Sequence, residues 1–322
     1  MVGTDLLTKC SDIKFKPPTV TVQMPVFNGE NYLADAIESM LSQTYKDFEF
    51  IIIDDGSTDD SLNIINCYAH SDARIHVVSR ENRGLGTTQQ ELLQLAQGEY
   101  IAQMDQDDIS LPNRLELQVE FLESNPKVVV LGGACELIDS FDRYITTLKM
   151  PLTNYDIQSH ILGGHGAIAH PSAMMRSTHL KLIGGYNTKL NTAMDLDLWL
   201  RMGEVGELGN CNDVLLKYRL HDKSVSEKFG DIQRDEARQA CEDAWERRNI
   251  TYQFSADELW RPGPDRASQH KFMLKYGWWA WNSRQRGTAL FYGCKAIRAR
   301  PFSMAGWMLL IVSLIKRKPA EL

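Results

Sequence analysis

Three carboxylates are concentrated in the stretch MDQDD, residues 104–108, as Asp105, Asp107 and Asp108. Like charges a few ångströms apart raise one another's pKa unless a counter-charge is present. Carboxylate oxygens are hard ligands that suit Mg²⁺ or Mn²⁺, and Mg²⁺ usually keeps only one or two protein carboxylates. Water and the phosphates of a substrate complete its shell. The spacing therefore favours half of a divalent-metal site whose other half is a diphosphate.

A second acid pair, Asp54 and Asp55, ends the apolar run FEFIIIDD. An Asp at the end of a strand can instead cap the next helix or form an Asx turn. For Asp108, which precedes ISLPNRLELQVEFL, this structural interpretation and a direct metal role are equally good. For Asp107 the two neighbouring acids favour the functional interpretation.

The elements that must position these acids are predicted from hydrophobic periodicity. Apolar, partly β-branched runs predict strands at residues 19–27, 48–55, 74–79 and 98–104, with helical spacing between them. This alternation, from residue 19 to about 131, predicts an α/β fold with a mostly parallel sheet covered by helices on both faces. Ligands of such sheets bind beyond the carboxyl ends of the strands, where both acid groups are expected.

Several motifs occur together in one order. They are PVFNGENYLADAIESMLSQTYKDFEFIIIDDGSTDDS, ENRGLGTTQQELLQLAQGEYIAQMDQDD, HPSAMMR, GGYN and MDLDLWLRM. This order closely resembles the family 2 glycosyltransferases of the Rossmann-like GT-A fold, over roughly residues 20–226. The resemblance implies transfer of a sugar from a nucleotide-diphosphate-sugar to an acceptor hydroxyl, with inversion at the anomeric carbon and with Mn²⁺ or Mg²⁺ as cofactor.

The resemblance also implies roles for individual positions. Asp105 matches the acid near the ribose, and Asp107 the acid on the metal and diphosphate. The run GLGTTQQELL departs from the family's more usual pattern beside the nucleotide. The positions that match donor-binding residues of the family are Pro25, Val26, Glu30, Asp54, Asp55, Asn82, Gly84 and Asp105.

Asp195 in MDLDLWLR matches the catalytic base of the family. Inversion by direct displacement needs a group that accepts the proton of the acceptor hydroxyl, and a carboxylate at the start of a helix can do this. The family commonly has Glu-Asp where this chain has Met194 and Asp195, so one carboxylate is missing. Spacing alone would favour an ordinary helix cap, and the flanking motifs favour the base. Asp197 is expected to be structural.

Two histidines are candidates for the site, although a lone His is more often structural. His221 follows a predicted strand, DVLLKYRL, and in some related enzymes a His there approaches the metal or diphosphate. It is therefore considered as a metal ligand beside Asp107. His170 is expected to shape the acceptor side. Arg201 is either an ion-pair partner inside the site or a surface charge.

Composition limits the function classes and the organisation. The net charge of -7 and the pI near 5.7 argue against a nucleic-acid reader. The six cysteines are scattered without metal-site spacing, and the first eighteen residues lack the apolar core of a signal peptide. A cytoplasmic location is therefore expected. The predicted organisation is an N-terminal lead (1–18), a GT-A catalytic domain (19–226) and a helical C-terminal appendage (227–322).

The final run MAGWMLLIVSLIKRK holds about twelve apolar residues, short of the ~20 that span a bilayer. Basic residues flank it and Trp307 lies within it, as in segments that lie in the headgroup region of an anionic inner leaflet. A helix packed on the catalytic domain, or on a second subunit of a homo-oligomer, explains the run equally well. Both interpretations stay open on the sequence.

The sequence thus predicts a metal-dependent inverting glycosyltransferase that acts on a glycan or lipid-linked glycan in the biosynthesis of a surface polysaccharide or glycolipid. A catalytically inactive nucleotide-sugar-binding protein is one alternative, against which Asp107 and Asp195 count. A nucleotidyltransferase is another, and it would need a Gly-rich phosphate loop that PVFNGENYL does not offer.

Overall fold

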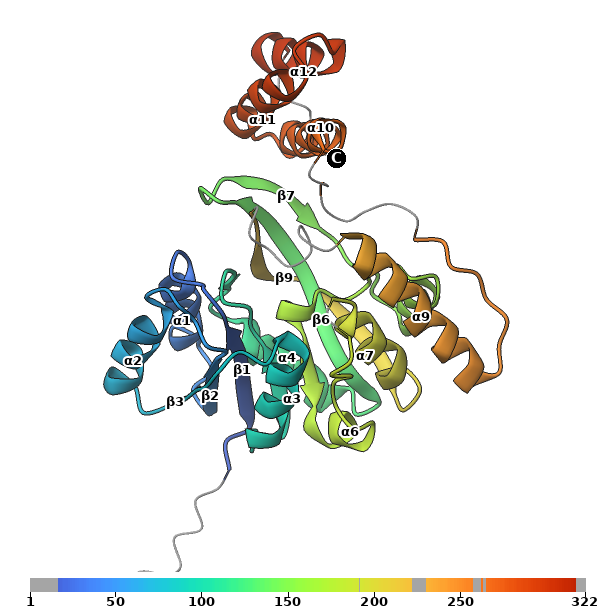
Figure 1. The fold of residues 1–322 in the computed structure, drawn as a ribbon. Helices are drawn as coiled ribbons and strands as arrows, with labels where there is room; N and C mark the ends of the chain where they lie inside the picture. Colours follow the sequence, from blue (N-terminus) through green and yellow to red (C-terminus); the bar gives the residue numbers. More distant parts are fainter. Residues whose placement is uncertain (1–16, 191, 222–229, 257–261, 263–264, 317–322) are drawn as a thin grey trace, which may run out of the picture.

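The computed structural model describes residues 17–316 except 191, 222–229, 257–261 and 263–264 (Figure 1). A central sheet flanked by helices makes up most of the molecule, and three C-terminal helices gather at one end of it. Cys10, Arg317 and Lys318, as well as most of the predicted N-terminal lead, fall outside the described residues.

The first part of the chain alternates strands and helices as the periodicity predicts. Its four strands are parallel and lie in the order β3-β2-β1-β4. The elements are β1 (Val20–Val26), α1 (Leu33–Leu41), β2 (Phe48–Asp54), α2 (Ser61–Ser71), β3 (Ile75–Ser79), α3 (Leu85–Leu95) and β4 (Tyr100–Gln103). Every residue of β1 and β2 is buried, because helices cover both faces of the sheet. The predicted α/β class is confirmed.

The second part completes the sheet with mixed pairing. β8 lies antiparallel between β4 and β6, and β6 pairs in parallel with the long β9. The remaining elements of this part are β5 (Ile109–Ser110), α4 (Arg114–Ser124), β6 (Val128–Asp139), β7 (Tyr144–Leu148), α5 (Asn154–Leu162), the 3₁₀ turn η1 (His170–Ser172), β8 (Met174–Arg176), α6 (Ser177–Leu182), α7 (Met194–Met202) and β9 (Glu207–Leu220). The sheet order continues as β4-β8-β6-β9-β5, with β7 on β6.

The C-terminal region contains two kinds of helix. α9 (Gly230–Arg248) packs its small residues, among them Ala237 and Cys241, into the same core as α5 and α7. α10 (Arg266–Asn282), α11 (Arg286–Ala299) and α12 (Met304–Ile315) form a core of their own against the ends of β6, β7 and β9. The predicted boundary at 226/227 lies outside the described residues, so the domain division stays a prediction.

The last helix is short. No helix in the described part of the chain combines the length and the apolar character needed to cross a membrane.

Candidate active site

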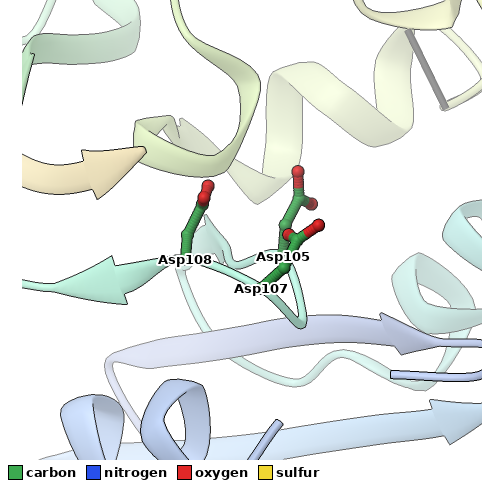
Figure 2. Close-up of side chains that lie close together, drawn as sticks. All are labelled: Asp105, Asp107 and Asp108. Atoms are coloured by element: carbon green, nitrogen blue, oxygen red, sulfur yellow. The ribbon is translucent and has the colours of Figure 1, made fainter. Parts of the chain in front are cut away.

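The three acids of residues 105–108 come together in the loop that joins β4 to β5 (Figure 2). One carboxylate oxygen from each of Asp105, Asp107 and Asp108 lies within 4.8 Å of the others. Asp105 and Asp107 are partly exposed, whereas Asp108 is buried. The clustering predicted from the sequence is therefore present at the carboxyl end of a parallel strand.

Within this cluster, Asp105 has a strongly raised pKa. Burial raises its pKa to about 7, and the charges of Asp107 and Asp195 add to the increase. The side chain keeps a solvent-exposed part although protein surrounds it closely. Asp105 therefore keeps its proton to a higher pH than an ordinary Asp does. A bound cation would lower this pKa and release that proton.

His221 lies beside the acids, as its predicted role requires. Its Nε2 atom is 2.7 Å from Oδ2 of Asp107. Its ring lies 5.2 Å from the ring of Tyr32. The residue directly follows β9, whose parallel pairing with β6 brings it to the edge where β4 ends. An imidazole nitrogen and a carboxylate oxygen thus lie side by side as a potential ligand pair.

Asp108 has a contact that neither sequence-based alternative included. Its Oδ1 accepts a hydrogen bond from the backbone N–H of Arg219 at 2.8 Å. The Arg219 Nε donates to the carbonyl oxygen of Asp107 at 2.8 Å, and its guanidinium pairs with Asp142 and lies over Tyr32. Asp108 therefore joins the acidic loop to β9, next to His221.

Gln106, the middle residue of the acidic motif, was not predicted to have a role. Its side-chain amide makes two hydrogen bonds to the backbone of Phe27, accepting from N at 2.8 Å and donating to O at 3.1 Å. Gly29 leaves room for it, since a Cβ there would lie 2.5 Å from Oε1 of Gln106. The loop after β1 and the acidic loop are thereby held together. No sequence signal separates this Gln from an ordinary surface residue.

Asp55 organises the loop before α3. Its carboxylate accepts hydrogen bonds from the Arg80 guanidinium, from the Arg83 N–H at 2.8 Å and from the Gly84 N–H at 3.0 Å. Gly84 has φ +84°, which favours glycine. Asn82 lies exposed in the same loop. Asp55, one of the predicted donor-binding residues, thus already has three hydrogen-bond donors, two of them backbone N–H groups.

The other predicted donor residues lie at the same edge of the sheet. Asp54 is buried and accepts from Ser57 N at 3.2 Å and Ser79 Oγ at 2.9 Å, which ties the end of β2 to β3. Val26, the last residue of β1 after Pro25, pairs in register with Asp54. Glu30 is exposed and accepts from the Asp60 N–H at 3.1 Å. These residues flank the acids, and whether they contact a donor remains a prediction.

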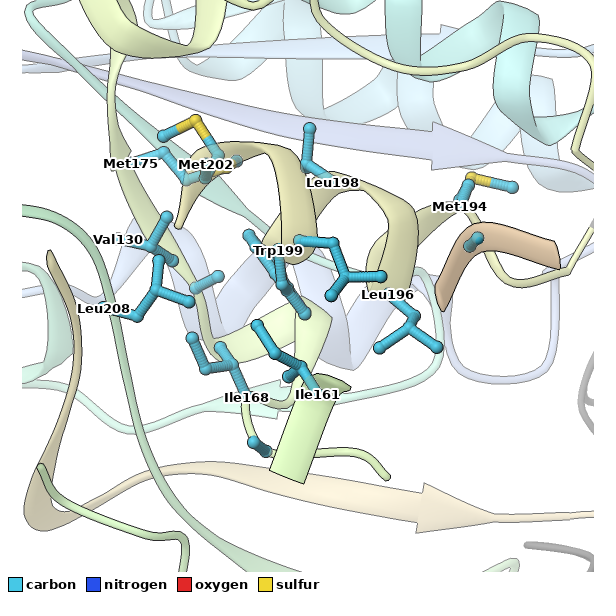
Figure 3. Packing of buried hydrophobic residues seen from close by; sticks show 14 of the residues in the cluster. Val130, Ile161, Ile168, Met175, Met194, Leu196, Leu198, Trp199, Met202 and Leu208 are labelled. Atoms are coloured by element: carbon cyan, nitrogen blue, oxygen red, sulfur yellow. The ribbon is translucent and has the colours of Figure 1, made fainter. Parts of the chain in front are cut away.

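α7 places Asp195 near Asp105. The first turn of α7 contains Asp195, whose Oδ1 accepts from the Leu196 N–H at 2.8 Å. Burial raises the Asp195 pKa, and that N–H only partly offsets the increase. Figure 3 shows why the helix is fixed: Trp199 points into a cluster that includes Ile161 and Ile168. The helix start is therefore held by core packing.

Asp197 and Arg201 have a structural arrangement. Asp197 is buried and accepts from Arg201 Nη2 at 2.6 Å and Nε at 2.9 Å. The Arg201 guanidinium also donates to the carbonyl oxygens of Ile183 and Gly185 at 3.1 Å and 2.7 Å. The pair connects α7 to the GGYN turn, which agrees with the structural role expected of Asp197.

The GGYN turn places Tyr186 close enough to Asp105 and Asp195 for their charges to act on it. Its hydroxyl lies 3.0 Å from His170 Nε2 and accepts from Gln103 Nε2 at 2.7 Å. Burial lowers the pKa of His170 to about 4, so the imidazole is neutral. Burial, together with the charges of Asp105 and Asp195, raises the Tyr186 pKa well above its usual range. The predicted acceptor-side His170 thus belongs to a buried neutral network.

Arg114, a second residue that sequence reasoning missed, supplies a fully buried positive charge. It donates to the carbonyl oxygen of Gln103 at 2.7 Å and to Gln118 Oε1 at 3.1 Å. Burial lowers its pKa to about 10, so it stays charged at neutral pH and lowers the pKa of Asp105. It acts as a built-in counter-charge for the acids.

Residues 21–182 match the model of "Glycosyl transferase family 2". The chain is 37% identical over 211 residues to the putative glycosyltransferase EpsE of Bacillus subtilis, covering 63% of this chain and 73% of EpsE. It is 30% identical over 218 residues to the chondroitin synthase of Escherichia coli, covering 68% of this chain but only 31% of that protein.

Two solved structures share the fold at 16% sequence identity. TarS 1–349 of S. aureus in complex with UDP superposes with a TM-score of 0.52, over 91% of this chain and 90% of that one. The mannosyltransferase PcManGT of Pyrobaculum calidifontis, in complex with GDP-Man and Mn²⁺, gives a TM-score of 0.54 over 94% and 81%. The predicted GT-A fold with C-terminal helices is confirmed. The chain belongs to glycosyl transferase family 2.

Proposed function

We propose that this chain is an inverting, metal-dependent glycosyltransferase that moves a sugar from a nucleotide-diphosphate-sugar to an acceptor hydroxyl. The observation that carries the proposal is the convergence of Asp105, Asp107 and His221 with Asp195. These groups come from three separate segments of the chain. A direct displacement needs a metal site for the departing diphosphate and a base for the acceptor hydroxyl, and these residues would supply both at one edge of the sheet.

The residues present fit Mn²⁺ or Mg²⁺. Asp107 and His221 would hold the ion, with the diphosphate and water completing its shell. An imidazole ligand favours Mn²⁺ over Mg²⁺. Burial raises the pKa of Asp105 to about 7 and the charges of Asp107 and Asp195 add to the increase, so a cation beside these carboxylates would offset an unfavourable charge. When bound, the ion would offset the charge of the departing nucleoside diphosphate.

Asp195 is proposed as the general base. The acceptor oxygen forms its bond to the anomeric carbon while the bond to the diphosphate oxygen breaks, and the hydroxyl proton moves to the Asp195 carboxylate. The N–H of Leu196 holds this carboxylate in place. Its raised pKa makes it a stronger base than an ordinary Asp.

The donor is proposed to bind along the edge formed by the ends of β1, β2 and β4, beside Pro25, Val26, Glu30, Asp54, Asp55, Asn82, Gly84 and Asp105. The solved relatives bind donors with different bases, UDP-GlcNAc in TarS and GDP-Man in PcManGT. They support a nucleotide-sugar as the donor class without selecting one base.

The acceptor is proposed to be a glycan or lipid-linked glycan of a surface polysaccharide or glycolipid. Relatives named as a chondroitin synthase and a hyaluronan synthase support polysaccharide synthesis. The proposed place of action is the cytoplasmic face of the membrane, where the enzyme would bind peripherally.

A panel of nucleotide-sugars tests donor and metal together. We expect one donor to raise the melting temperature in Mn²⁺ and to lose this effect in excess chelator. Asp107→Asn should lose it too. Glu99→Gln should keep it, because Glu99 is exposed and precedes β4 at the opposite end from Asp105. Turnover of the selected donor in chelator, or stabilisation of Asp107→Asn equal to wild type, would reject the metal-dependent function.

A further inference from the structure

α12 presents an apolar face to solvent. Seven of the seventeen exposed large hydrophobic side chains in the described residues fall between positions 302 and 315, so exposure of apolar surface is concentrated there. The members of this surface, called the α12 face below, are Phe302, Met304, Trp307, Met308, Ile311, Leu314 and Ile315. Those on the helix recur at helical spacing, which makes one continuous stripe.

The opposite side of α12 is packed against its neighbours. Gly306, Leu309 and Ser313 are buried. A Cβ on Gly277 of α10 would lie 2.4 Å from Leu309, and one on Gly293 of α11 would lie 3.4 Å from the α12 backbone. The buried side of α12 therefore packs on α10 and α11, and the α12 face is the side of the helix that no described residue covers.

The charge of the chain is divided sharply at residue 265. Residues 266–322 contain eleven Lys and Arg but only one Asp or Glu, Glu321, which gives this segment a formal charge of +10. The preceding 265 residues carry the other 24 basic and 41 acidic residues, a charge of -17. The basic residues around the α12 face that the structure describes as exposed are Lys295, Arg298, Arg300 and Lys316.

α11, on which α12 packs, is connected to the acidic loop through a short chain of contacts. The Tyr292 hydroxyl of α11 donates to Asp139 Oδ2 at 3.3 Å, at the end of β6. The Arg219 guanidinium contacts the carbonyl oxygen of Asp139 and the side chain of Asp142, while its backbone N–H binds Asp108. Figure 1 shows α10, α11 and α12 together beyond β7. The three helices thus cap the side of the sheet on which the candidate active site lies.

We propose that the α12 face docks on the surface of an anionic lipid bilayer. The helix has twelve residues, about 18 Å at 1.5 Å per residue, so it would lie along the surface rather than span ~30 Å of hydrocarbon. Apolar side chains enter the headgroup boundary, and the surrounding Lys and Arg meet the lipid phosphates. This inference rests on the proposed function, because it positions the site toward a lipid-linked acceptor.

A second copy of the chain fits this surface less well. A two-fold contact would place the α12 face against itself and so bring two +10 segments together. An anionic leaflet instead supplies the opposite charge over the whole surface. The charge division therefore selects the bilayer as the occupant.

Flotation with vesicles tests the proposal. We expect the full chain to float with vesicles of 30% phosphatidylglycerol in phosphatidylcholine, to stay behind with pure phosphatidylcholine, and to bind less in high salt. The double variant Met308→Asp/Ile311→Asp should lower the bound fraction at least tenfold. The control is Leu182→Asp on α6, which exchanges an apolar residue that is more exposed than Met308 or Ile311 but lies outside the α12 face, and it should bind as wild type.

A charge variant keeps the test decisive if the apolar variant does not fold. Arg298→Glu/Arg300→Glu changes exposed residues only and should also release the protein from anionic vesicles. Equal binding to both vesicle types, wild-type binding by a folded variant, or a dimer that Met308→Asp/Ile311→Asp dissociates would overturn the proposal. Donor turnover measured without vesicles separates the two hypotheses, since docking variants should retain it, whereas failure of the enzymatic function would leave flotation unchanged.

Discussion

The Nε2 atom of His221 lies 2.7 Å from Oδ2 of Asp107 although 114 residues separate them in the chain. His221 follows the end of β9, and Asp107 lies in the loop after β4. The contact therefore depends on two strands that are not neighbours in the sheet. It is the pair that would hold the divalent ion.

Removing either member of this pair should weaken metal binding. We expect Asp107→Asn and His221→Ala each to lower the affinity for Mn²⁺ by about tenfold or more in the presence of the nucleoside diphosphate. Free Mn²⁺ measured by electron paramagnetic resonance during a titration gives the affinity, with Glu99→Gln as control. If His221→Ala binds Mn²⁺ like wild type, the imidazole only positions Asp107.

The proton on Asp105 makes stability depend on pH. Its pKa is about 7 in the folded protein and 3.8 as an ordinary Asp. Because the folded state binds this proton more tightly, the metal-free protein should lose free energy of unfolding as pH rises from about 4 to about 7. Asp105→Asn removes the charge, so it should stabilise the metal-free protein at pH 8 by roughly 1–2 kcal/mol, discounted for solvent screening.

Urea unfolding in chelator at pH 4 and pH 8 checks this linkage. At pH 4 the folded wild type is neutral at this position, as Asp105→Asn is, so the two proteins should differ little in free energy of unfolding. At pH 8 saturating Mn²⁺ should close the gap, because the ion replaces the proton on the wild-type carboxylate. An Asp105→Asn variant that is less stable than wild type at pH 8 without metal would contradict the proposal that the charge on Asp105 destabilises the folded protein.

Local patterns predicted the part of the fold in which neighbours in sequence are neighbours in space. The alternation of β1 to β4 with α1 to α3 follows from apolar periodicity, and the acids at strand ends follow from the parallel sheet. The mixed pairing of β8, β6 and β9 could not be predicted from local sequence patterns. These strands are distant in sequence, and their register is set by packing in the folded chain.

The missed residues share the same cause. Arg114 is a polar residue at the start of a helix, and only the folded chain shows that it is buried and that its charge acts on Asp105. The contact of Asp108 with Arg219 joins positions 111 residues apart. α9 has a charged sequence, yet its small residues Ala237, Ala240, Cys241 and Ala244 form the stripe that enters the core. Such a narrow stripe of small residues gives only a weak hydrophobic signal.

Gln106 and Gly29 should act as one unit. Gln106→Ala removes two hydrogen bonds to Phe27, and Gly29→Ala should displace the same side chain, because the new Cβ would lie 2.5 Å from its Oε1. We expect each variant to lose about 1 kcal/mol of stability and to raise KM for the donor.

A double-mutant cycle checks this coupling. The double variant should be scarcely worse than either single variant, since both remove one contact. Gly287→Ala is the control, because a Cβ at that helix position would meet no other part of the described chain within 4 Å. Fully additive losses would show that Gly29 serves the loop independently of Gln106.

Asp195→Asn tests the base most directly. It keeps the shape of the side chain and its contact with the Leu196 N–H, but it removes the basic oxygen. We expect kcat to fall by roughly 10²–10⁴-fold with little change in donor affinity. In wild type kcat/KM should rise with pH as Asp195 loses its proton, at a pKa raised above 3.8, and this rise should vanish in the variant.

Asp197→Asn, two residues further along α7, separates chemistry from structure in the same helix. It weakens the ion pair with Arg201 that binds the turn at Gly185, so it should lower the melting temperature. Its kcat per folded molecule should stay within a few-fold of wild type, because the carboxylate of Asp197 is buried in that ion pair. If Asp195→Asn instead loses donor affinity at unchanged kcat, Asp195 belongs to the nucleotide site and another group removes the proton.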